Sequence, residues 1–194
     1  TAINLSAGRD VILGAALTAN GVSGSVVLRA DSDGTGPGAL AGTVTFAAGA
    51  VTATGDVTIR FNPDGYANTS TEIGIFDGLT TQVGAFDARA WTFVNNSSAV
   101  ALSKPYDGTT TATLDTPFTF KSGPDGSLGQ VVTLVAGAAN FNSKNVTATT
   151  VNFTGYGLSG GGDSANYELF AQPTSQLQSI TQKSVTITGT VADN

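Results

Sequence analysis

The chain has 194 residues, of which 40% are hydrophobic and only 11% are charged. Its net charge of −6 leaves no basic surface of the kind that nucleic-acid binding requires. The absence of His and Cys excludes disulfide scaffolds, thiolate metal sites and His-dependent catalytic triads. The 25 glycines and the many threonines favour short strands joined by tight turns, so we expect an all-β chain.

The apolar runs are all much shorter than the ~20 residues that cross a bilayer, so we expect no membrane insertion. The first ten residues lack the basic and then apolar head of a signal peptide. The chain is therefore either cytoplasmic or a piece of a longer protein, and we expect the second.

Residues 1–65 consist of short apolar runs separated by corners that carry glycine. Two sets of three residues align at offsets in the low thirties, namely Val11, Leu17 and Val26 with Val44, Val51 and Val57. This spacing predicts stacked coils of a parallel β-helix, in which each coil buries its apolar face against its neighbours. An ordinary meander of hairpins is the alternative.

Two segments of this region, "SAGRDVILGAALTANG" and "AAGAVTATGDVTIR", carry a family resemblance. They resemble the repeat of filamentous-haemagglutinin-like exoproteins of the two-partner secretion type, over about residues 2–62. The resemblance implies a β-helix in a secreted protein.

The loop "DSDGTG" at 31–36 suggests a calcium site, because Asp31 and Asp33 alternate as they do at the start of an EF-hand loop. The twelfth position of such a loop is Gly42, which cannot supply the bidentate Glu. A turn without a ligand is the favoured interpretation, and calcium remains the only cofactor to consider.

Residues 66–98 are interpreted as a last coil, or as a cap and junction that covers the end of the stack. The runs "EIGIFDG" (72–78) and "ARAWTFV" (88–94) are predicted as strands. Trp91 is expected to plug the apolar end of the stack, and a sugar-stacking role is the alternative.

Residues 99–194 have longer and more aromatic strand-like runs, with turns every 8–12 residues, which fit a small antiparallel sandwich or a grasp-like sheet. The predicted strands are "AVALSKPYD" (99–107), "PFTFK" (117–121), "QVVTLVAG" (130–137), "VTATTVNFTG" (146–155), "NYELF" (166–170) and "SVTITGTV" (184–191).

Four pieces of this half carry a second resemblance: "KPYDGTTTATL" (104–114), "VTLVAGAANFNSKNV" (132–146), "LSGGGDSANYEL" (158–169) and "ITQKSVTITG" (180–189). Their order and spacing resemble the YDG domain, which occurs in tandem, often beside MBG domains, in bacterial surface adhesins. The resemblance implies adhesion, aggregation or biofilm formation. It also implies that the last piece starts a following repeat.

The segment "PYDG" is predicted to be a structural corner. Pro105 fixes the approach, Asp107 can accept hydrogen bonds from the backbone two residues on, and Gly108 can adopt a positive φ. The ring of Tyr106 is expected to be buried, with its hydroxyl bonded to backbone as in a tyrosine corner.

We do not expect an enzyme. A mechanism based on paired carboxylates remains conceivable, since such pairs cleave glycosidic bonds. However, most Asp residues lie in Asp-Gly turns, and the two Glu residues, Glu72 and Glu168, are far apart in the sequence.

The expected function is a stalk or adhesive segment of a large exoprotein, secreted or held at the bacterial cell surface, with neighbouring repeats of the same polypeptide as partners. One alternative is a module that binds surface glycans or exopolysaccharide through the aromatic side chains Trp91, Tyr106, Tyr156 and Tyr167. A second alternative is the stalk of a toxin-delivery exoprotein.

Overall fold

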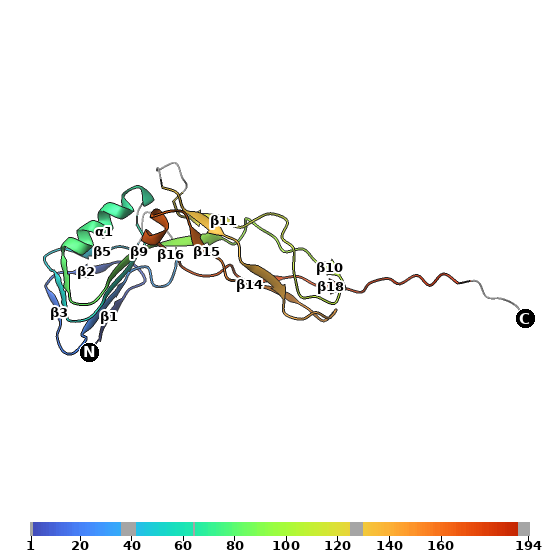
Figure 1. The fold of residues 1–194 in the computed structure, drawn as a ribbon, viewed down its shortest axis with the longest axis horizontal. Helices are drawn as coiled ribbons and strands as arrows, with labels where there is room; N and C mark the ends of the chain where they lie inside the picture. Colours follow the sequence, from blue (N-terminus) through green and yellow to red (C-terminus); the bar gives the residue numbers. More distant parts are fainter. Residues whose placement is uncertain (1, 36–41, 64, 125–129, 190–194) are drawn as a thin grey trace, which may run out of the picture.

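The computed structural model describes residues 2–35, 42–63, 65–124 and 130–189. It is elongated and built mostly of β-strands, with its N-terminal strand and its C-terminal segment toward opposite ends (Figure 1). Parallel sheets form the N-terminal part, and small antiparallel sheets follow. No helix among these residues is long and apolar enough to cross a membrane.

Three parallel sheets make up the N-terminal part, and the chain visits them in a fixed order. The first contains β1 (Ala2–Ser6), β4 (Ser25–Arg29), β7 (Val57–Phe61) and β9 (Phe86–Asn95). The second contains β2 (Val11–Leu13) and β5 (Val44–Phe46), and the third contains β3 (Leu17–Ala19), β6 (Val51–Ala53) and β8 (Thr80–Gln82). Successive turns of the chain are therefore stacked on one another.

The strand registers confirm the alignment that the sequence predicted. The Cα partners are Val11 with Val44, Leu17 with Val51, and Val26 with Val57. These pairs are parallel, so the alternative of a hairpin meander is wrong for this part of the chain. Parallel partners need a crossover, and here the other two sheets supply it.

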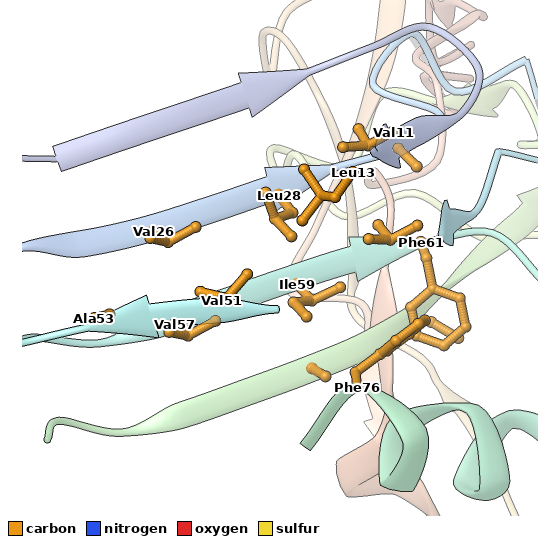
Figure 2. Close-up of a cluster of buried hydrophobic side chains, with 14 of the residues drawn as sticks. Val11, Leu13, Val26, Leu28, Val51, Ala53, Val57, Ile59, Phe61 and Phe76 are labelled. Atoms are coloured by element: carbon orange, nitrogen blue, oxygen red, sulfur yellow. The ribbon is translucent and has the colours of Figure 1, made fainter. Parts of the chain in front are cut away.

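The space between the three sheets is filled by apolar side chains from each turn of the chain. Figure 2 shows side chains of β4, β6 and β7 directed toward one another. Val26, Leu28 and Ile59 are completely buried, as are Val51 and Phe61. Buried and less buried residues alternate along β4 and β7, as expected for strands with one apolar face.

The segment "EIGIFDG" forms part of a helix, so the strand predicted at 72–78 is wrong. A 3-10 turn, η1 (Tyr66–Asn68), leads into α1 (Thr69–Gly78). The chain visits the three sheets in turn, and α1 lies between β7 and β8, where a strand that pairs with β5 in the second sheet would be expected. The ring of Phe76 contacts Phe46 and Phe61, with ring centroids 5.9 and 5.1 Å apart. A short apolar run fits either type of element, and packing against β5 decides for the helix here.

The strand predicted at 88–94 lies within β9, which joins the two parts of the molecule. Its first half pairs in parallel with β7. Further along, it pairs in parallel with β16 (Tyr167–Leu169) and antiparallel with β11 (Thr119–Ser122). One continuous strand therefore belongs to the stacked coils and also to the sheet that follows.

The remaining strands are short and form small sheets. The antiparallel pairs are β12 (Thr133–Val135) with β15 (Gly157–Ser159), β13 (Ala138–Phe141) with β14 (Thr150–Thr154), and β14 with β17 (Gln176–Leu177). In addition, β10 (Lys104–Pro105) pairs in parallel with β18 (Ile180–Thr181), and a 3-10 turn, η2 (Asp163–Asn166), precedes β16.

This arrangement corrects two expectations about the second half. The antiparallel pairing is confirmed, but β10–β18 and β9–β16 are parallel, so a purely antiparallel sheet is wrong. Residues 184–189, expected in a strand, are extended and exposed but pair with no strand among the described residues. The last residues of that expected strand, 190–191, lie outside the described part of the chain.

Candidate functional site

The "PYDG" corner lies where β10 ends. The Asp107 carboxylate accepts hydrogen bonds from the backbone N and the Oγ1 of Thr109, both at 2.9 Å. Gly108 has a φ of +81°, which residues with a Cβ rarely adopt. Asp107 and Gly108 therefore both take part in the turn.

Lys104 closes this corner, a role that the sequence did not indicate. Its Nζ donates to Asp107 Oδ2 at 3.0 Å, to Thr109 Oγ1 at 2.8 Å and to the carbonyl of Thr111 at 2.8 Å. The ammonium also lies 5.7 Å from the centre of the Phe141 ring. The three acceptors match the three N–H donors of the Lys104 ammonium, so these hydrogen bonds stabilise the corner.

The Lys104 hydrogen bond and those from Thr109 lower the pKa of Asp107 to about 2. A lowered carboxyl pKa contributes stability that is present above the ordinary value of 3.8 and is lost as the pH falls toward 2. We expect Asp107→Asn to lower the free energy of unfolding above pH 4, and the difference from the wild type to vanish toward pH 2. Urea unfolding across this range measures it.

The Lys104→Gln variant provides the control for this effect. In that background, Asp107→Asn should have a smaller effect at neutral pH, because the ion pair is already absent. A difference between Asp107→Asn and the wild type that does not change between pH 2 and pH 6 would contradict the assignment.

Tyr106, by contrast, is not the buried ring that was expected. Its side chain is 40% exposed, and its backbone N donates to the carbonyl of Thr181. The corner therefore relies on Lys104 and Asp107, and the Tyr106 ring presents surface to solvent.

The other three aromatic candidates for glycan binding are buried. Trp91 is 1% exposed, and Tyr156 and Tyr167 are also in the interior. Trp91 donates from Nε1 to the carbonyl of Ala30 at 3.2 Å and meets the Phe170 ring edge-on. Such rings offer no face to a sugar, so Tyr106 is the one candidate of the four with an available ring.

A second group of polar contacts lies where the stacked coils meet the later sheets. The Tyr167 hydroxyl bonds to Gln130 Oε1 at 2.5 Å, and Gln130 Nε2 donates to the carbonyl of Tyr66. The Tyr66 hydroxyl donates to the carbonyl of Trp91 at 2.9 Å. Burial raises the pKa of both tyrosines, so they stay protonated and act as hydrogen-bonding groups in the core.

Arg60 of β7 connects three strands at the same junction. Its guanidinium bonds to Asp87 of β9 at 2.7 Å and to Glu168 of β16 at 2.5 Å. Arg89 holds the other carboxylate oxygen of Asp87 at 2.8 Å. Burial acts to raise the pKa of Asp87, but the hydrogen bonds and charges of Arg60 and Arg89 outweigh it, so the net pKa is lowered.

The carboxylates suggested for calcium form a hydrogen-bonded turn. Asp31 is buried, and its oxygens accept from Asn62 Nδ2 at 2.9 Å and from the N and Oγ1 of Thr35 at 3.2 Å. Asp33 accepts from the same Thr35 N. Within the described ranges, no three His, Cys, Asp or Glu side chains lie together as metal ligands would. These donors give Asp31 and Asp33 a structural role in the turn.

Comparison with known proteins finds a family match for part of the chain. Residues 90–176 match the YDG domain family, a range that starts within β9 and includes the Lys104 corner. No curated protein and no solved structure matches the chain. The resemblance of residues 2–62 to filamentous-haemagglutinin-like repeats has no counterpart in these comparisons and stays a prediction.

Proposed function

We propose that this chain, which carries a YDG domain at residues 90–176, is a stalk segment of a large bacterial exoprotein that is secreted or held at the cell surface. The stalk holds a more distant binding region away from the cell and so serves adhesion, aggregation or biofilm formation. Neighbouring repeats of the same polypeptide are its partners in this role, and it performs no chemistry of its own.

The observation that carries this proposal is the shared strand β9. Its first half is the last parallel strand of the stack, and its second half holds β11 and β16. A flexible linker would let two modules swivel, whereas a shared strand with main-chain hydrogen bonds on both parts resists bending. The Arg60 ion pairs and the Tyr66–Gln130–Tyr167 contacts brace the same joint.

In the same proposal, the three stacked sheets are the end of a parallel β-helix of the filamentous-haemagglutinin type. Support comes from the in-register parallel pairs and from the fixed order of the three sheets. In this interpretation α1 covers the edge of β5, where a bare strand would expose unpaired backbone groups. Export by two-partner secretion follows from the resemblance of residues 2–62.

A glycan-binding module is the second candidate, because Tyr106 presents an exposed ring beside an ordered corner. A glycan array probed with the whole chain, together with small-angle X-ray scattering, separates the two functions. A stalk should scatter as the extended particle of Figure 1 and bind no glycan reproducibly. Reproducible binding that Tyr106→Ala abolishes would favour the second candidate, and a compact or flexible particle would argue against a stalk.

A further inference from the structure

An apolar slot runs between two extended segments of the YDG region, residues 111–118 and 134–140. Its main cavity has a volume of about 550 Å³. The slot floor is made by Leu114, Leu134 and Tyr156, which pack in one apolar cluster with the buried side chains of Phe118 and Phe153. The slot therefore opens directly onto the interior of the domain.

The two walls of the slot are joined at one end by the isolated antiparallel bridge between Thr111 and Asn140. At the closed end, Ala112 N donates to the carbonyl of Ala139 at 2.9 Å, and Phe141 N donates to that of Thr110 at 2.7 Å. The reciprocal bond from Ala139 N to the carbonyl of Ala112 is absent from the described backbone contacts. Beyond this point the described backbone contacts include no further hydrogen bond between the two walls.

The walls present backbone N–H and C=O groups with which a further strand can pair. The outer edge of residues 113–115 is occupied, since Leu102 N donates to the carbonyl of Thr113 and Asp115 N donates to that of Val100. Backbone groups of successive residues in a strand point to opposite edges. The N–H and C=O of Leu114 therefore face the slot, as does the N–H of Ala139.

The same chain carries an extended segment that pairs with no strand among the described residues. Residues 184–189 read "SVTITG", with apolar and polar residues in alternation. Val185 is 80% exposed and Ile187 is 91% exposed, and the segment runs away from the body of the molecule (Figure 1). The segment follows the β10–β18 pairing, which anchors its start.

We propose that residues 184–189 of one copy of this chain add a strand to the slot of a second copy, with Val185 and Ile187 on the apolar floor. Six extended residues span about 20 Å, enough to follow walls of this length. Main-chain hydrogen bonds provide affinity, and the two apolar side chains set the register. This goes beyond a stalk, which can act as a single chain, because it links copies head to tail.

Disulfide trapping tests the proposal cleanly, because the chain contains no Cys. Copies with Thr113→Cys are mixed with a differently sized copy carrying one Cys at each of positions 184–188 in turn. Because the faces of a strand alternate, cross-linking should rise and fall with a period of two along the tail. Chance collision gives no such period. Equal yields along the tail, or yields no higher than with Ser70→Cys on α1 in place of Thr113→Cys, would overturn the proposal.

Tail variants provide the second measurement. Val185→Asp with Ile187→Asp should reduce trapping by about tenfold or more, because each change puts a charge where an apolar side chain would be buried. Thr186→Asp with Thr188→Asp adds the same charge to the other face and should have a much smaller effect. All four side chains are exposed, so we expect both double variants to fold like the wild type. Equal losses of trapping from the two double variants would contradict strand insertion. The glycan array tests the proposed function separately, so the two proposals can fail independently.

Discussion

Replacing Phe61 with alanine should lower the free energy of unfolding by about 4 kcal/mol. Phe61 ends β7 and is completely buried. Its ring meets Phe76 of α1 edge-on, with the ring centroids 5.1 Å apart. Truncation removes a large apolar side chain from the point where helix and stack meet and leaves a cavity that the sheets cannot close.

Urea unfolding followed by the fluorescence of Trp91, the only tryptophan, measures this loss. Ile12→Ala is the matched control, because Ile12 lies on β2 with its side chain directed to solvent. It should change stability by no more than about 0.5 kcal/mol. Similar losses for the two variants would mean that the two residues do not differ in burial as described.

The stacked coils could be predicted because their signal is local and repeated. Each short apolar run that is followed by a glycine at a corner predicts a strand. The spacing between the runs predicts which strands pair. The partners Val11–Val44 and Leu17–Val51 followed from counting alone. The helix α1 gave no such signal, since its placement depends on Phe46 and Phe61, which precede it by many residues.

Only the part of the Lys104 corner that depends on local neighbours could be predicted from the sequence. The turn geometry of Asp107 and Gly108 depends on their immediate neighbours, so the segment itself indicated it. The role of Lys104 depends on the carbonyl of Thr111 and on the distant Phe141 ring, so the sequence offered no sign of it. The burial of Trp91 and the exposure of Tyr106 are likewise set by which strands join β9 and β10.

The ion pairs of Arg60 also lay beyond sequence reasoning, since Glu168 comes from a strand more than a hundred residues away. Their loss should have the second large effect. We expect Arg60→Ala to lower the free energy of unfolding by about 2 kcal/mol, because the Arg60 side chain is only 12% exposed and its removal leaves Asp87 and Glu168, which are 37% exposed, without their shared cation.

Arg89→Ala is the control for Arg60→Ala, because both arginines bind Asp87. The Arg89 side chain is 41% exposed and pairs with Asp87 alone, so its loss should cost less than about 1 kcal/mol. If the joint is rigid because of Arg60, urea unfolding of Arg60→Ala should also split into two transitions, with Trp91 fluorescence and far-ultraviolet circular dichroism no longer coincident. Equal costs for the two variants would show that Arg60 forms ordinary surface ion pairs, and the stiffness of the proposed stalk would then depend on the backbone of β9 alone.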